Sequence, residues 1–494
     1  MIVKLSEREY KDKVMACWIG KNIGGTMGGP YEGSRKVLDV KGFSTPKGEP
    51  LPNDDLDLQL VWLFALETLG PRNVNAQSLG EFWLSYIPPH WNEYGVGKAN
   101  MKMGIPAQVS GDYKNEWLNS NGAFIRSEVW ACVCPALPEL AVQYALNDGS
   151  IDHGAGEGTI AEAFVAALQS SAFVLSLNES IDVALKCIPA ESRMAKSIKL
   201  VRECYESGKT WLEARNAVFE QNSDLGDGWF EAPSNVAYAV IGMLYGEGDF
   251  KKSMITAINC GDDTDCTAAT VGATFGILHG TEKIPSDWKE YVGDKIVTIS
   301  LAQGNSGANM PKTLQDLTNR VVEAGKAVLY SHNAFFWTGR RQNNYVYIAD
   351  ENDVPSDIYE WLNKRAEVVR KSLDLKPNTY TIKTHLFKAT ATLSKVTIKE
   401  NDDEVILTVD ISQNPAYDSA HYSLAFRWWL PEGFEVIGNK ASYVGSHGDY
   451  KYAKPVTETF KIKTTKTEAV NRLVLEISTP GRPTMTYLPV TLLG

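Results

Sequence analysis

Three segments in the first half of the chain are apolar around nearly the whole circumference of a helix. They are DLQLVWLFALETLG (57–70), GTIAEAFVAALQSSAFVLS (158–176) and APSNVAYAVIGMLYG (232–246). A helix of this kind is stable only when other helices surround it. The chain must therefore fold into a multi-helix domain with buried central helices. A more amphipathic segment at 357–373 is expected to close that domain.

Beyond residue 376 the pattern changes to short segments rich in β-branched and aromatic residues. These segments span 390–400, 403–412, 421–430, 433–438, 458–465 and 472–479. Turn sequences such as Pro431-Glu432-Gly433 separate them. Short strands with turns at regular intervals are typical of a β-sandwich. We therefore expect a multi-domain protein, with an all-α domain over 1–375 and a β-sandwich over 376–494.

Charge and composition argue against several classes of protein. The net charge of −11 disfavours a nucleic-acid partner, because phosphate binding needs clustered Lys and Arg. No apolar stretch reaches the length of a membrane span, and the N-terminal sequence lacks the apolar core of a signal peptide. The seven cysteines are scattered, which is typical of reduced thiols in a cytoplasmic protein. The sequence carries no indication of the oligomeric state.

Carboxylates are crowded at the starts of two apolar helices. NDD at 53–55 precedes one, and NCGDDTDC at 259–266 opens another. One Asp is enough to cap a helix, whereas adjacent buried carboxylates repel each other and are costly to desolvate. Two interpretations stay open here. The residues are helix caps, or they bind a hard divalent cation such as magnesium or manganese, which prefers oxygen ligands.

Two glycine-rich segments also carry polar side chains. GKNIGGTMGGPYEG (20–33) contains Glu32, but it lacks the spacing of a phosphate-binding loop. Its glycines mark either close helix packing or an irregular turn. The second segment, HGAGEG, begins at His153. Gly154, Gly156 and Gly158 in it leave backbone amides accessible to a ligand, although a single His is commonly structural.

Taken together and in this order, the segments resemble the ADP-ribosylglycohydrolase family. The matching residues are Glu32 with the glycines before it, Asn53-Asp54-Asp55, Asn121-Gly122-Ala123 with Arg126, His153 to Gly158, and Asn259 to Cys266. The resemblance extends from about Cys17 to about Trp288. It implies an all-α fold with a two-ion magnesium site, in an enzyme that removes ADP-ribose from modified side chains or related acceptors.

The resemblance also implies a role for each matched residue. The metal ligands would be Asn53, Asp54, Asp55, Asp263, Asp265 and Cys266. The substrate would contact Asn121, Gly122, Arg126, His153, Gly154 and Gly156. Glu32 would be the catalytic acid or base, with Asp54 or Asp55 as alternatives.

Three positions depart from the family pattern. Asn53 replaces a hydroxyl ligand, and Asp262 stands where the family has Gly. Cys266 replaces a threonine ligand, and a thiol is a poor ligand for a hard cation. The sequence therefore leaves open whether one or two ions bind, and Mn²⁺ is an alternative to Mg²⁺.

We expect a metal-dependent hydrolase that cleaves a glycosidic bond at the ribose of ADP-ribose-modified substrates, whether small molecules or proteins. Two alternatives stay open. One is a non-catalytic ADP-ribose or nucleotide-binding protein, favoured by Asn53 and Cys266. The other is a hydrolase of another glycoside or nucleoside. In the β-sandwich, Trp428 and Trp429 form either a sugar platform or part of the core.

Overall fold

The computed structural model describes most of the chain and divides it into two compact units. The described residues are 4–52, 54–105, 107–226, 228–301, 309–332, 336–338, 344–347, 357–373, 378–384, 386–413, 422–445 and 455–494. One unit runs up to Leu373 and the other begins at Asp374.

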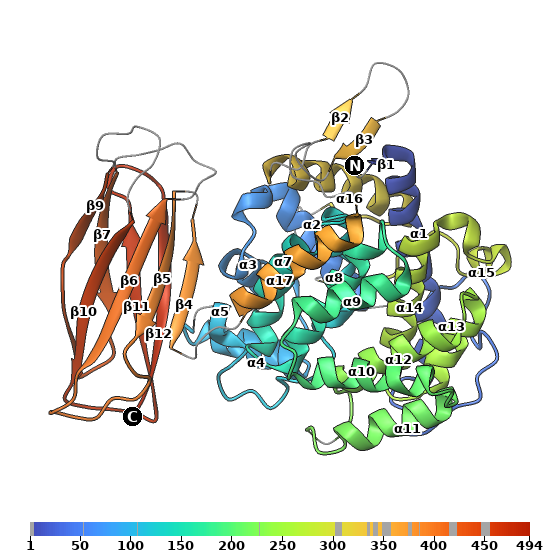
Figure 1. Cartoon of the computed structure of the whole chain (residues 1–494), viewed down its shortest axis with the longest axis horizontal. Helices are drawn as coiled ribbons and strands as arrows, with labels where there is room; N and C mark the ends of the chain where they lie inside the picture. Colours follow the sequence, from blue (N-terminus) through green and yellow to red (C-terminus); the bar gives the residue numbers. More distant parts are fainter. Residues whose placement is uncertain are drawn as a thin grey trace. The chain divides into compact units, whose positions relative to one another are not determined.

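The first unit is helical (Figure 1). Its α-helices are α1 (Glu7–Gly28), α2 (Asp54–Leu69), α3 (Ala76–Tyr86), α4 (Asn92–Lys102), α5 (Ala107–Ser110), α6 (Glu128–Val133), α7 (Pro138–His153), α8 (Glu157–Ala172), α9 (Leu177–Cys187), α10 (Arg193–Glu206), α11 (Trp211–Asn222), α12 (Ala232–Tyr245), α13 (Phe250–Asn259), α14 (Thr264–His279), α15 (Ser286–Val292), α16 (Leu314–Ser331) and α17 (Ile358–Leu373). The three apolar segments form α2, α8 and α12, and nearly every residue of α8 and α12 is buried. The prediction of buried central helices is confirmed.

A small sheet in this unit was not predicted. Strand β1 (Lys4–Ser6) pairs with β3 (Asn344–Tyr347), which also pairs with β2 (Phe336–Thr338), and both pairings are antiparallel. Strands of three or four residues are too short to show a period of two in the sequence. No helix in the described part of this chain has the length and hydropathy to cross a membrane.

The second unit consists of two antiparallel sheets that share one core, as predicted (Figure 1). One sheet has the order β4-β5-β6-β10-β8 and the other β12-β11-β7-β9. The strands are β4 (Thr379–Lys383), β5 (Phe387–Leu393), β6 (Val405–Gln413), β7 (Tyr422–Trp429), β8 (Phe434–Ile437), β9 (Ala441–Val444), β10 (Val456–Thr464), β11 (Val470–Ser478) and β12 (Met485–Leu493). Phe387, Val409 and Leu473 are fully buried between the sheets.

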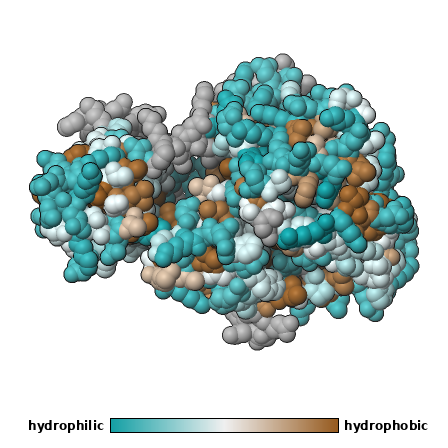
Figure 2. Space-filling view, turned by 90° about the horizontal axis from the view of Figure 1, so that it is seen from below, coloured by the Kyte–Doolittle hydropathy of each residue, from teal (hydrophilic) through white to brown (hydrophobic). Residues whose placement is uncertain are grey.

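The two tryptophans of β7 point to opposite faces of their sheet, because side chains alternate along a strand. Trp428 packs on the core residue Phe460, with ring centroids 5.5 Å apart. Trp429 is 47% exposed, and its indole N–H donates to Glu476 at 2.9 Å. The core interpretation therefore holds for Trp428 and not for Trp429. Figure 2, which shows one face of the molecule, has apolar residues in separate small groups among hydrophilic ones.

The glycines of the 20–33 segment serve close helix packing. Helix α1 lies so near α14 that a Cβ atom on Gly20 would come within 2.0 Å of the carbonyl oxygen of Gly272. A Cβ on Gly24 would lie 2.3 Å from the backbone of Ala268, and one on Gly28 would lie 2.3 Å from the oxygen of Thr264. The structure shows close packing at Gly20, Gly24 and Gly28, and a turn at Gly33, where φ is +81°.

The register of these contacts shows that the two helices run antiparallel. The end of α1 therefore meets the start of α14. The loop after α1 is joined there by two backbone hydrogen bonds, from the Gly33 N–H to the Asp262 oxygen (3.1 Å) and from the Asp262 N–H to the Ser34 oxygen (2.9 Å). This packing brings Glu32 to the mouth of α14.

We expect Gly24→Ala to destabilise the first unit by roughly 1–3 kcal/mol, because overpacking forces the two helices apart. The better helix propensity of Ala, about 1 kcal/mol, is too small to offset a contact with backbone atoms. Chemical denaturation measures this change. The matched control is Gly42→Ala, since a Cβ there would have no atom within 4 Å. Equal stability of the two variants would contradict the packing argument.

Candidate functional site

Carboxylates from three segments meet where α1 ends and α2 and α14 begin. Donor oxygens of Glu32, Asp263 and Asp265 lie within 4.8 Å of one another. Donor atoms of Asp55, Asp265 and Cys266 also lie within 4.8 Å of one another and form a second group. Asp265 therefore belongs to both groups. Asp54 is close enough to Glu32 to affect its pKa. Asn53 lies outside the described residues.

The environment of these carboxylates disfavours their charged forms. Burial raises the pKa of Asp263 well above its usual value, and the nearby Glu32 adds to the shift. Burial and then Asp263 do the same for Asp265. The pKa of Glu32 is raised by burial and by Asp54. Asp263 and Asp265 are buried, so their negative charge is concentrated where little water is present to stabilise it, whereas Glu32 is exposed to solvent.

Helix capping does not account for these residues. Asp263 occupies the N-cap position of α14, yet its side chain makes no capping hydrogen bond to the described backbone. One oxygen each of Asp263 and Asp265 is buried with no hydrogen-bond donor among the described residues, apart from the contact that the two carboxyl groups make with each other when one is protonated. Buried carboxylate oxygens normally have partners, so these two are suited to an additional group of positive charge.

Asn121 lies directly against this cluster. Its side-chain amide donates to Asp263 Oδ2 at 2.7 Å. Asn235 supports the same arrangement, because its amide oxygen accepts from the Asp263 N–H at 3.3 Å. The family resemblance implies that Asn121 contacts the substrate, and this role stays a prediction; in the structure its amide is bonded to a carboxylate. Asn235 was not predicted as a site residue from the sequence. Its one distinguishing feature in the sequence is that it is a polar residue in the mostly apolar helix α12.

Asp262 has a conformation that explains why the family pattern has Gly there. Its φ of +69° lies in the left-handed region that favours glycine. The carboxylate accepts hydrogen bonds at 3.1 Å from the Phe230 N–H and from the side chain of Asn235. Asp262 therefore fastens the segment before α12 to the turn that carries Asp263.

A buried lysine, also missed, lies beneath the cluster. Lys21 of α1 is fully buried, and its Nζ is 3.5 Å from Asp55 Oδ2 and 3.1 Å from Glu128 Oε2. The other oxygen of Asp55 accepts from the Cys266 thiol at 3.3 Å. Burial raises the pKa of that thiol well above its usual value, so the sulfur stays protonated. Nothing in the sequence of α1 indicates that Lys21 faces a carboxylate.

Arg126, from the short helix η3 (Phe124–Arg126), is fully buried and orders the turn before it. Its guanidinium donates to both oxygens of Asp152, at 2.7 and 2.9 Å, and to Asp148 at 2.9 Å. A further hydrogen bond reaches the carbonyl oxygen of Gly122. Although burial raises the pKa of Asp152, Arg126 lowers it to about 2. The guanidinium is thus engaged within the protein.

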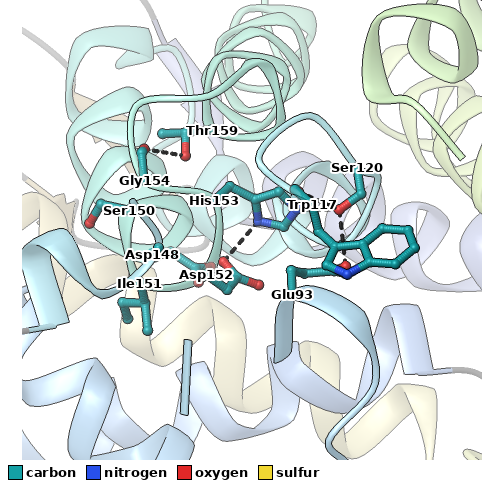
Figure 3. Close-up of polar contacts among 12 residues, drawn as sticks. Glu93, Trp117, Ser120, Asp148, Ser150, Ile151, Asp152, His153, Gly154 and Thr159 are labelled. Carbon is teal, nitrogen blue, oxygen red and sulfur yellow. Dashed lines mark hydrogen bonds and ion pairs between the residues drawn. The ribbon is translucent and has the colours of Figure 1, made fainter. Parts of the chain in front are cut away.

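His153 lies between Asp152 and Ser120 (Figure 3). Its Nδ1 is 2.9 Å from Asp152 Oδ1, and its Nε2 is 3.1 Å from the Ser120 hydroxyl, which donates to Glu93 at 3.0 Å. This chain of contacts holds the end of α7 against the segment that carries Asn121.

The glycines after His153 permit this close approach. The Gly156 N–H donates to the His153 oxygen, and the Gly158 N–H donates to the Leu118 oxygen. Gly154 has a φ of +54°, in the left-handed region. Two of the amides that the sequence offered to a ligand are therefore used internally, and a substrate contact by Gly154, Gly156 or His153 stays a prediction.

We expect Asp262→Gly to lower stability by about 1–3 kcal/mol, because two hydrogen bonds to a charged acceptor are lost. Relief of the left-handed backbone, worth roughly 1 kcal/mol, offsets only part of that loss. Thermal or chemical denaturation provides the measurement. Asp262→Asn is the control, since it retains an acceptor for the Phe230 N–H and should lie between the two. A glycine variant more stable than the wild type would show that the two hydrogen bonds of Asp262 do not stabilise the fold.

A family model described as ADP-ribosylglycohydrolase matches residues 6–326. Among solved structures, the chain is similar to one described as "ADP-ribosylglycohydrolase-related protein complex", with 21% identity, 65% of this chain and 99% of that chain covered, and a TM-score of 0.43. No protein with a curated description matches the sequence significantly.

Proposed function

Because this chain belongs to the ADP-ribosylglycohydrolase family, we propose that it is a metal-dependent hydrolase of a glycosidic bond at the ribose of an ADP-ribosyl substrate. One observation carries the proposal. Glu32, Asp263 and Asp265 converge within 4.8 Å, and the two aspartates each have a buried oxygen without a hydrogen-bond donor outside the pair in the described structure. Such oxygens favour a divalent cation.

The donor set fits magnesium or manganese. Asp54, Asp263 and Asp265 offer the hard oxygen ligands that these ions prefer, and Asp55 lies beside them. Cys266 remains a hydrogen-bond donor to Asp55 in this proposal, since its thiol is protonated. A bound divalent ion would orient the ribose hydroxyls and activate a water molecule.

Glu32 is the residue that we propose as general base. Its raised pKa, caused by burial and Asp54, moves it toward neutral pH, where a general base works best. In the reaction, the bond from the anomeric carbon to the leaving group breaks through an oxocarbenium-like state. Water attacks that carbon while Glu32 accepts the proton of the water, and the leaving group departs with the bonding electron pair and takes up a proton from solvent. Asp54 and Asp55 are the alternative bases.

The polar turns beside the cluster would bind the rest of the substrate. In this proposal the Asn121-Gly122 turn, fixed by Arg126 through the Gly122 oxygen, contacts the ribose and diphosphate. The 153–156 turn lies against the same segment through Ser120. Arg126 and His153 would then act mainly by ordering these turns. We assign catalysis to residues 1–375 and an accessory role to 376–494, since every site residue precedes residue 267.

Turnover tests this function directly. We expect hydrolysis with millimolar Mg²⁺ of at least one compound in a set of ADP-ribosylated arginine and serine peptides, with chelator abolishing it. Nucleosides and aryl glycosides serve as comparison substrates. Binding of ADP-ribose without any turnover would favour the non-catalytic alternative, and cleavage of nucleosides or aryl glycosides alone would favour the other hydrolase.

Mg²⁺ should also raise the melting temperature of the full chain. A ligand that binds only the folded state stabilises it, by about 2.7 kcal/mol at one hundred times its Kd. Differential scanning calorimetry with and without Mg²⁺ measures the shift, with Asp263→Asn as the variant that should respond least. An unchanged melting temperature at millimolar Mg²⁺ and neutral pH argues against a metal site.

Glu32→Gln is expected to lower turnover by about 10²–10⁴-fold, the usual contribution of a general acid or base. Gln preserves the shape but cannot accept the proton, so the Mg²⁺ affinity should stay within about threefold of wild type. Steady-state kinetics and calorimetry measure the two quantities, and Glu49→Gln, on an exposed loop residue, is the control. Wild-type turnover would exclude Glu32 as the base. Loss of metal together with activity would pass that role to Asp54 or Asp55.

A further inference from the structure

Lys21 places a permanent positive charge inside the acidic site. The side chain is fully buried, and its Nζ donates to the carbonyl oxygen of Ile125 at 2.8 Å. It also contacts Glu128 at 3.1 Å and Asp55 at 3.5 Å. With three contacts on three sides and no exposed surface, the ammonium is held in place.

Asp55 is consequently occupied by the protein itself. One of its oxygens faces Lys21, and the other accepts from the thiol of Cys266 at 3.3 Å. A cation bound by the Asp55, Asp265 and Cys266 group would lie close to the ammonium and would need a thiol as ligand. Repulsion between like charges and the poor match of sulfur with hard cations both disfavour it.

The opposite side of the site has no such cation among its described contacts. Asp263 and Asp265 are 3% and 8% exposed, and each has an oxygen without a hydrogen-bond donor outside the pair in the described structure. Both belong to the group with Glu32. The two halves of the carboxylate cluster therefore differ in charge balance.

We infer that Lys21 stands in for a second divalent cation, so that the chain binds a single ion, on the Asp263–Asp265 side of the site. The inference rests on the proposed function, because it presumes that the site binds a metal at all. Lys21 is in this account a positioning residue. It keeps Asp55 fixed at the edge of the site without contacting substrate.

Glu128 is the second buried carboxylate that balances the charge of Lys21. One of its oxygens also accepts from the side chain of Gln59 at 2.8 Å, so its position is fixed. Removal of Lys21 alone would leave Glu128 buried without its counter-charge, which is strongly destabilising. The informative variant is therefore the double substitution Lys21→Met with Glu128→Gln, which removes both charges together.

The test counts bound ions with Mn²⁺ as the probe, by equilibrium dialysis and calorimetry on the full chain. We expect one equivalent in the wild type. In the double variant we expect a second equivalent, or binding of the first that is tighter by at least about tenfold, because the nearer positive charge is gone. Lys98→Met is the matched control. It removes another buried ammonium, one that donates to the backbone oxygens of Ile87, Pro88 and Pro89.

The outcomes separate this inference from the proposed function. Two equivalents in the wild type would overturn the role of Lys21 while leaving a metal-dependent enzyme intact. A double variant that binds one equivalent with unchanged affinity would overturn it as well, as would Lys98→Met producing the same change. No bound ion in the wild type would instead refute the metal site on which both proposals depend.

Discussion

The backbone contact between α1 and α14 is the constraint on which the site depends. Gly20, Gly24 and Gly28 remove every side chain from one line along α1, and each lies against backbone atoms of α14. Because the helices are antiparallel, this contact sets the end of α1 beside the start of α14. Glu32 and Asp263 are more than two hundred residues apart in sequence, and this packing is what joins them.

A second constraint is the balance of buried charge. The mouth of α14 holds Asp263 and Asp265, and the start of α2 adds Asp54 and Asp55. Desolvation raises the pKa of all four, so the cluster is unfavourable for a folded protein unless a positive charge accompanies it. Lys21 supplies part of that positive charge from within the chain. In our proposal, a divalent cation supplies the rest.

Much of the architecture was predictable because it depends on local patterns. Apolar helices such as α8 and α12 are recognisable from composition, and strands such as β6 and β11 from alternation. Strands β4, β9 and β12 were missed. The first two are short, and Pro489 interrupts the pattern of β12, where an edge position tolerates a residue without an N–H.

The candidate site was predictable only in part. Crowded aspartates indicated a site, since local spacing already brings like charges together. The partners of Asn121, Asp262 and Lys21 were not foreseeable, because each contact joins elements that are distant in sequence. The sequence of α1 gives no sign of which carboxylate Lys21 faces. Such long-range pairings follow from helix packing, which composition does not encode.

The central claim is that the carboxylate cluster binds a divalent ion beside the reacting ribose. A crystal structure of the protein with Mn²⁺ and ADP-ribose, recorded at a wavelength where manganese scatters anomalously, tests it most directly. The account predicts an anomalous peak within coordination distance of Asp263 and Asp265, with the anomeric carbon of the ribose facing Glu32. A cluster without an anomalous peak, or ADP-ribose bound away from Glu32, would contradict it.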